Sequence, residues 1–156
     1  MRQAEKAFAR TVKELWARLG LRPNSSPPTR SLRLVVDGIS LLLSDRGKYL
    51  LIEANAAEIS ADDAVRAAQL KSALKVNLGL LLSCEASLYL VDREDKKHLV
   101  SRAAYRYSVN SISRLIATIE DAVNLVDFFN RVSSENGLPA SNEVRGSRPS
   151  SFVFVP

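Results

Sequence analysis

Residues 69–82, which read QLKSALKVNLGLLL, decide the fold of this chain. The run starts with the spacing of an amphipathic helix and ends apolar on nearly every side, which predicts a helix buried on several faces. Ser60 is the expected N-cap, and Asp62 and Asp63 complement the helix dipole, so the helix is expected to run from Ser60 to Leu82. In a domain of this size, so apolar a helix is naturally placed at a subunit interface.

Asn77 is a polar residue in the most apolar part of this helix. A polar group among leucines must find hydrogen-bond partners, or it costs about 1–3 kcal/mol. Two interpretations are open at this point. Either the side chain bonds to a nearby backbone group, or it sets the register at a subunit interface.

The residues before this helix predict three strands, which are Leu32–Val36, Ile39–Ser44 and Lys48–Ala54. Asp37-Gly38 is a strong signal for a two-residue hairpin turn, and Asp45-Arg46-Gly47 is interpreted as a three-residue turn. Because both connections are short, the strands are expected to form an antiparallel meander.

Side-chain alternation assigns these strand residues to two faces of the sheet. The expected core face holds Leu32, Leu34, Val36, Ile39, Leu41, Leu43, Tyr49 and Leu51. The other face mixes polar residues with an apolar group made of Val35, Leu42, Leu50 and Ile52. A sheet face open to water is normally polar, so this group needs a cover. A helix of the same chain or a partner protein would provide one.

The rest of the chain completes a single α+β domain over residues 1–132. Its expected elements are a helix over residues 3–19, strands over Ala86–Val91 and Lys97–Ala103 joined by a turn at Asp92–Lys96, and a helix from Ser111 to Val132. The predicted order is α-β-β-β-α-β-β-α, with a twisted antiparallel sheet and flanking helices. Residues 133–156 are expected to form a flexible tail, in which Phe152–Val155 pairs transiently with a sheet edge.

Composition narrows the class of protein. The chain has 156 residues, 46% of them hydrophobic and 25% charged, as in an ordinary globular domain. Its one cysteine, Cys84, allows no intrachain disulfide, and no apolar stretch reaches the roughly 18 residues of a membrane span. Charges interrupt any signal-like apolar run near the N-terminus. A cytoplasmic protein without a membrane span is therefore expected.

Much of the net charge of +5 lies in the first helix. Arg2, Lys6, Arg10 and Lys13 recur at a spacing that places them on one helical face. Such a face is a candidate patch for nucleic acid or for an acidic protein segment. More often it is simply the solvated side opposite a buried stripe.

The sequence offers no pattern for catalysis or metal binding. It contains no glycine-rich phosphate loop, no C-x-x-C pair and no HExxH motif. His98 falls in a predicted strand, and Cys84 has no neighbour that would stabilise a thiolate. The acidic groups near Asp62 and Asp92 lack the spaced ligands of an EF-hand loop. We expect a protein that is not an enzyme and that uses no cofactor or metal.

The element order and several local patterns resemble those of class I type III secretion chaperones, a family of small bacterial cytosolic proteins. The resemblance covers roughly residues 4–132 and lies in pattern more than in invariant residues. It rests on Leu32–Val36 with Asp37-Gly38 and Ile39–Ser44, on Leu70–Leu82 with Asn77, and on Ala86–Asp92 with Leu99–Val100. Two features differ from the family: many members are acidic whereas this chain is basic, and the segment after Val132 is long.

The resemblance implies a homodimer that binds the extended N-terminal segment of a secreted effector, keeps it soluble and competent for secretion, and so serves virulence. The family dimerises through its second helix and fourth strand, which implies an interface of Leu74, Asn77, Leu78, Leu81, Leu88 and Leu90. Family effectors contact apolar grooves at the first helix and the sheet, which implies client-binding residues Phe8, Val12, Val35, Leu42, Leu50 and Ile52.

A second hypothesis comes from another class of protein, a basic α+β module that binds nucleic acid through the first helix. Exposed aromatic residues at stacking positions would favour it, yet aromatic residues make up 6% of the chain. Salt separates the two hypotheses, because phosphate binding weakens steeply with salt and apolar strand addition does not.

Overall fold

The computed structural model describes residues 2–21, 26–137 and 152–154. Its long helices are α1 (Arg2–Arg18), α2 (Asp63–Leu80) and α3 (Ile112–Glu135), and a short 3-10 helix, η1, spans Tyr107–Val109. Its strands are β1 (Ser31–Val36), β2 (Ile39–Asp45), β3 (Tyr49–Glu58), β4 (Ser87–Arg93), β5 (Lys96–Arg106) and β6 (Phe152–Phe154). The predicted α+β class and element order are confirmed up to α3.

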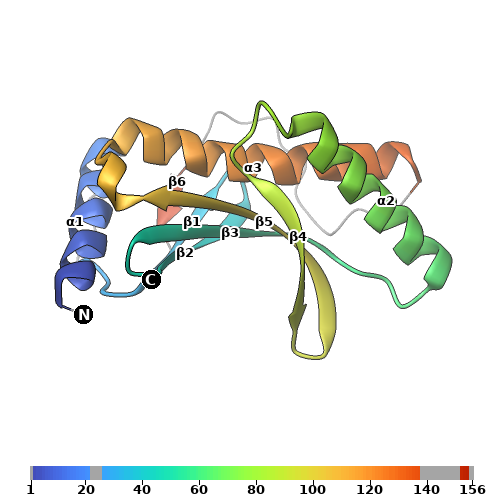
Figure 1. Ribbon diagram of the computed structural model, residues 1–156, viewed down its shortest axis with the longest axis horizontal. Helices are drawn as coiled ribbons and strands as arrows, with labels where there is room; N and C mark the ends of the chain where they lie inside the picture. The colour runs from blue at the N-terminus through green and yellow to red at the C-terminus, as the bar shows by residue number, and fades with distance from the viewer. Residues whose placement is uncertain (1, 22–25, 138–151, 155–156) are drawn as a thin grey trace.

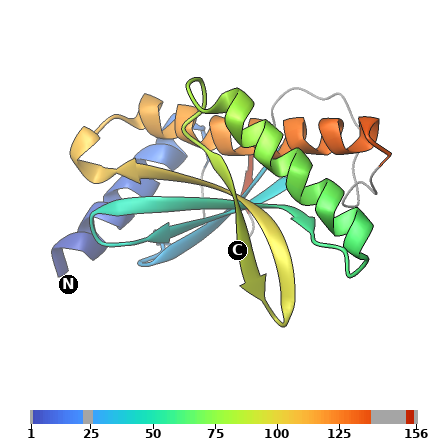
Figure 2. The same cartoon turned by 45° about the vertical axis from the view of Figure 1, so that its right-hand side comes forward.

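The helices lie on one face of the sheet, as Figures 1 and 2 show. Helix α3 runs across β3 and β5, α1 packs on α3 and β2, and α2 packs on α3 and β4. The β4–β5 hairpin extends beyond the rest of the sheet (Figure 1). The opposite face of the sheet carries no helix among the described residues.

The strands are antiparallel and follow the order β4-β5-β3-β2-β1-β6, so the described sheet has β4 at one edge and β6 at the other. The predicted β1–β2–β3 meander is confirmed. Asp37 and Gly38 turn the first hairpin with φ angles of 51° and 81°, the positive values that a tight two-residue turn requires. Glu94 and Asp95 close the β4–β5 hairpin in the same way, so that turn is shorter than predicted.

The core lies between the helices and the inner face of the sheet. Its largest fully buried side chains come from α1, α3 and the first three strands: Phe8, Leu15, Leu34, Leu41, Leu43, Leu50, Ile52, Leu115, Ile119, Leu125 and Phe129. Ser101 of β5 is buried there and donates a hydrogen bond of 3.0 Å from its hydroxyl to the Ala122 carbonyl of α3. The packing of α3 on the sheet therefore combines apolar burial with a satisfied polar contact.

The predicted face of β3 is wrong. Leu50 and Ile52 are 0% exposed in the core, whereas Tyr49 is exposed and Leu51 is half-buried on the opposite face. Asp45 pairs with Leu50, so four residues (46–49) lie between the last paired residues of β2 and β3 instead of the three expected. Because side chains alternate along a strand, one extra residue in a turn exchanges the two faces of the strand that follows.

Asp45 holds this longer turn. Its Oδ1 accepts hydrogen bonds of 2.9 Å from the Gly47 amide and 2.9 Å from the Tyr107 hydroxyl, while the Arg46 amide donates to the Tyr49 carbonyl at 2.9 Å. Burial, together with the bond to Asp45, raises the pKa of the Tyr107 hydroxyl, which therefore stays protonated and remains a donor. A contact from η1, which follows β5, thus fixes the turn between β2 and β3.

The start of α2 differs from the boundary that the sequence predicts. Asp62, not Ser60, is the N-cap of α2, because its carboxylate accepts from the Val65 amide at 2.9 Å. Ser60 lies two residues earlier, and its hydroxyl accepts from the Asp62 amide at 3.1 Å. Of the two residues that the sequence offers as the cap of α3, Asn110 and Ser111, the cap is Ser111, whose hydroxyl accepts from the Arg114 amide at 3.3 Å.

The C-terminal segment is described in part. Residues 133–135 belong to α3, and residues 138–151 and 155–156 of the predicted tail lie outside the described residues. Phe152–Phe154 forms β6, which pairs with β1 at the sheet edge. The edge pairing matches the expectation, and its transience stays a prediction.

The register of β3 yields a test with opposite outcomes for neighbouring leucines. Leu50→Glu should unfold the protein or lower the free energy of unfolding by more than about 3 kcal/mol, because it buries an unpaired carboxylate. Leu42→Glu, on the open face, should retain the native circular dichroism and change stability far less. Urea denaturation measures both, and equal losses for the two variants would contradict the register.

Candidate protein-binding surfaces

Helix α2 is turned with its leucines outward. The helix buries Gln69, Ser72, Ala73 and Val76. Leu74 is 63% exposed and Leu78 is 73% exposed, and Leu81 and Leu82 just after the helix are 68% and 100% exposed. A helix that packs with one side against a core normally buries its leucines and exposes its polar residues. We call the exposed residues Leu74, Leu78, Leu81 and Leu82 the α2 leucine surface.

Gln69 explains how the start of α2 is held with so little apolar burial. Its side-chain carbonyl accepts from the Ser60 amide at 2.9 Å, and its amide donates to the Glu58 carbonyl at 3.1 Å. Both ends of the buried amide group are therefore satisfied by the backbone that leaves β3. Polar contacts fix this part of the helix where leucines would normally do so.

Asn77 holds the other end of α2 against β4. Its Nδ2 donates to the Leu88 carbonyl at 2.9 Å, and its Oδ1 accepts from the Leu88 amide at 2.8 Å. The side chain thus pairs with β4 as a neighbouring strand would. This confirms the interpretation of Asn77 as a side-chain-to-backbone contact, and a role at a subunit interface stays a prediction.

Strand β4 continues the apolar surface beside α2. Leu90 and Tyr89 are both about half exposed and alternate on the two faces of this edge strand. The Arg102 guanidinium lies 5.6 Å from the centre of the Tyr89 ring, on the open face of the sheet. Helix α2 packs against β4, and Figure 2 shows that the two elements meet where the helix ends and the strand begins.

Of the residues expected at a dimer interface, all but Leu88 lie at or beside the α2 leucine surface. Leu74, Leu78, Leu81 and Leu90 are exposed, and Asn77 is half-buried between helix and strand. Leu88 is 6% exposed and belongs to the core, because its side of β4 faces the helices. A charge at Leu88 would therefore damage the fold of each chain. Leu82 adds to this surface, and the terminal leucine run of the sequence indicated it. Tyr89 lies on the open face of the sheet, and nothing in the sequence singled it out.

The open face of the sheet forms a second surface. Val35 of β1, Leu42 of β2 and Leu51 of β3 are half-buried there. One cross-strand row on this face joins Leu42, Glu53 and Arg102. We call these five residues, Val35, Leu42, Leu51, Glu53 and Arg102, the open-face surface.

Glu53 is the charged centre of the open-face surface. It is 6% exposed, and its Oε1 accepts from Arg102 Nε at 2.8 Å and lies 3.5 Å from Arg93 Nη2. The carboxylate is therefore paired on both sides, as a buried charge must be. Sequence reasoning missed this cluster, although a single Glu inside an apolar strand was a usable signal.

The residues expected to bind a client lie in two different places. Phe8 and Val12 point into the core at 0% and 1% exposure, and Leu50 and Ile52 are also buried. The expectation that these side chains present a free apolar surface is therefore wrong for the described chain. Val35 and Leu42 lie on the open face, as predicted. The extra turn residue and the packing of α1 on α3 account for the difference.

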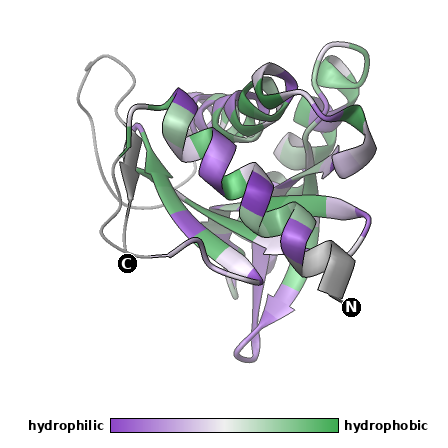
Figure 3. Ribbon diagram, turned by 90° about the vertical axis from the view of Figure 1, so that its left-hand side faces the viewer, coloured by the Kyte–Doolittle hydropathy of each residue, from purple (hydrophilic) through white to green (hydrophobic). Residues whose placement is uncertain are grey.

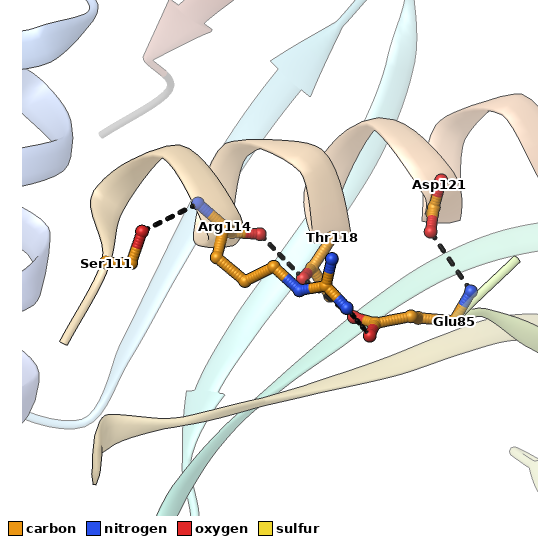
Figure 4. Close-up of polar contacts among 5 residues, drawn as sticks. All are labelled: Glu85, Ser111, Arg114, Thr118 and Asp121. Atoms are coloured by element: carbon orange, nitrogen blue, oxygen red, sulfur yellow. Dashed lines mark hydrogen bonds and ion pairs between the residues drawn. The ribbon is translucent and has the colours of Figure 1, made fainter. Parts of the chain in front are cut away.

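A cavity of about 400 Å³ lies at the start of α3. Its lining is Glu85, Ala104, Tyr105, Arg106, Val109, Arg114 and Thr118. Figure 4 shows that its polar groups engage one another: Arg114 forms an ion pair with Glu85, and the Glu85 amide donates to Asp121 at 3.0 Å. The Thr118 hydroxyl lies 2.8 Å from the Arg114 carbonyl, within the same helix. These contacts join α3 to the segment that leads into β4.

Cys84 and His98 are the residues of this chain whose side chain types most often take part in catalysis, and they lie between α2 and β4 and on β5, respectively. Burial raises the pKa of the Cys84 thiol, so the reactive thiolate is disfavoured at neutral pH. His98 is half-buried on β5, opposite Glu58 and Val91 in the strand register. Within residues 2–21, 26–137 and 152–154, no group of three or more His, Cys, Asp or Glu side chains is placed to hold a metal ion.

Helix α1 presents its cations to solvent. Lys6, Arg10 and Lys13 are exposed, while Val12 and Leu15 face the core. Figure 3 shows this alternation as hydrophilic and hydrophobic bands along the helix. The face is solvated, as expected for the side opposite a buried stripe.

No protein-family model matches this chain, and no curated protein matches it either. Among the described residues, no helix has the length and apolar character needed to cross a bilayer.

Asn77 gives a direct test of how α2 is attached. Asn77→Ala should lower the free energy of unfolding by about 1–3 kcal/mol, because it leaves the Leu88 amide and carbonyl without their partner. Asn124→Ala, at an exposed position of α3, is the matched control and should change stability by less than about 0.5 kcal/mol. Chemical denaturation provides the comparison, and a neutral Asn77→Ala would show that the two bonds do not hold the helix.

Proposed function

We propose that this protein is a bacterial cytosolic chaperone that acts as a homodimer and binds an extended segment of a secreted effector protein. The observation that carries the proposal is the orientation of α2, which buries small and polar residues and exposes its leucines. The element order that resembles class I type III secretion chaperones supports it. On this proposal the protein is not an enzyme.

The α2 leucine surface and β4 are the proposed dimer interface. Each leucine that becomes fully buried contributes about 1.5–3 kcal/mol relative to exposure, so Leu74, Leu78 and Leu81 supply a substantial driving force. The polar contacts of Gln69 and Asn77 keep these side chains pointing away from the core of their own chain. A second copy of the chain offers a matching apolar surface, as a twofold interface requires.

The open-face surface is the proposed client site. Val35, Leu42 and Leu51 provide separate half-buried apolar positions on neighbouring strands, into which alternate side chains of an extended segment would fit. The paired Glu53 and Arg102 lie between them and offer polar partners at the centre. A folded client would not present an extended strand whose alternate side chains are free to enter these positions. The bound segment is therefore expected to lack stable structure of its own.

Leu78→Asp tests the dimer. The wild-type protein should have the mass of a dimer by light scattering at micromolar concentration, and Leu78→Asp should be a monomer with native circular dichroism, because the charge must be desolvated at the interface. Val109→Asp, at an exposed apolar residue of η1, should remain a dimer. A monomeric wild-type protein would contradict the proposed interface.

The client site is tested with the N-terminal segments of proteins encoded beside this chain. One of them should co-purify with the wild-type protein, and Leu42→Glu should weaken its binding on the order of tenfold, which is about 1.4 kcal/mol. Arg10→Glu with Lys13→Glu should have a smaller effect, and binding should persist at high salt. If the charge reversals abolish binding and Leu42→Glu does not, the basic face of α1 is the working surface and the nucleic-acid hypothesis gains support.

A further inference from the structure

The edge of β1 is paired with a segment from the far end of the same chain. In β6, Phe154 pairs with Leu34, Val153 with Val35 and Phe152 with Val36, in antiparallel register. Figure 1 shows β6 beside β1, at the opposite side of the sheet from β4. Without β6, β1 would be the edge strand and would present unpaired amides and carbonyls.

The pairing is short. Among the described residues, β6 pairs with Leu34, Val35 and Val36, and the register holds no β6 partner for residues 31–33 of β1. A three-residue strand supplies few hydrogen bonds, so its occupancy depends mainly on its covalent attachment to the chain, which raises its local concentration. Such a strand is readily displaced by a longer segment that pairs with the whole of β1.

The sequence of the tail shows what this edge accepts. Residues 152–155 read FVFV, a wholly apolar run with aromatic residues at alternate positions. On β1, Leu34 and Val36 belong to the core, and Val35 belongs to the open-face surface. A segment added at this edge would run along the border between the core and the open-face surface.

We propose that the β1 edge is a docking site for an extended apolar segment of another polypeptide, and that β6 occupies this site in the free protein. The incoming segment would add to the sheet by antiparallel pairing with β1 and would displace β6. This inference rests on the proposed function in naming that segment as part of the client, while the edge and its occupant are features of this chain.

The test uses the full chain and a labelled peptide of residues 150–156, Ser-Ser-Phe-Val-Phe-Val-Pro. Val153→Pro removes an amide and disfavours strand pairing within β6. The peptide should bind Val153→Pro on the order of tenfold more tightly than the wild-type protein, because the competing strand attached to the chain is lost. Ser147→Pro, outside β6, is the control and should bind the peptide as the wild type does.

Hydrogen exchange supplies the second measurement. In Val153→Pro, the amides of Leu34, Val35 and Val36 that face β6 should exchange on the order of tenfold faster, and adding the peptide should restore their protection. If Val153→Pro does not fold, Phe152→Asn combined with Phe154→Asn weakens strand propensity at the same positions.

Three results would overturn the inference. Equal peptide affinity for Val153→Pro and Ser147→Pro would show that β6 does not compete for the site. Unchanged exchange at β1 would show that β6 does not cover the edge. A lower molar mass of Val153→Pro than of wild type would show that β6 docks on a second copy instead. Since the peptide comes from this chain, each result is independent of whether a secreted client exists.

Discussion

Two hydrogen bonds between the Asn77 side chain and the backbone of Leu88 fix α2 against β4, and the exposed apolar surface depends on them. The buried side of α2 is small and polar, so apolar packing contributes less there than in an ordinary amphipathic helix. Gln69 supplies the equivalent contact at the start of the helix. With both ends held by satisfied polar groups, the leucines are free to face outward.

This arrangement has a cost for an isolated chain. Exposed leucines and a strand edge side by side favour association, and soluble monomers rarely keep such a surface uncovered. The two edges of the described sheet are treated differently: β1 is paired with β6, while β4 is bordered by α2 and keeps Leu90 exposed. A second copy at β4 and an extended segment at the other end of the sheet would give each edge its own partner.

The sequence predicted most elements because their local signals agree with the tertiary structure. Asp37-Gly38 predicted the first hairpin, and the apolar stripe along residues 112–129 predicted α3. The prediction assigned the wrong face to β3, because the alternation of side chains along a strand does not determine the length of the turn before it. The Asp45 carboxylate binds Gly47 and the distant Tyr107, and that long-range contact accommodates the four-residue connection. One residue was enough to move Leu50 and Ile52 from the expected client surface into the core.

For the candidate surfaces too, the sequence determined some features and the tertiary structure decided the others. The sequence by itself determined that residues 69–82 are too apolar for one small core and that Asn77 needs a partner, because composition and spacing are local properties. The tertiary structure decided which side of α2 faces outward, that Leu88 is buried, and that Glu53 meets Arg93 and Arg102. These outcomes depend on contacts between residues far apart in the chain, and a helical or alternating pattern carries no information about which distant group will satisfy a buried polar atom.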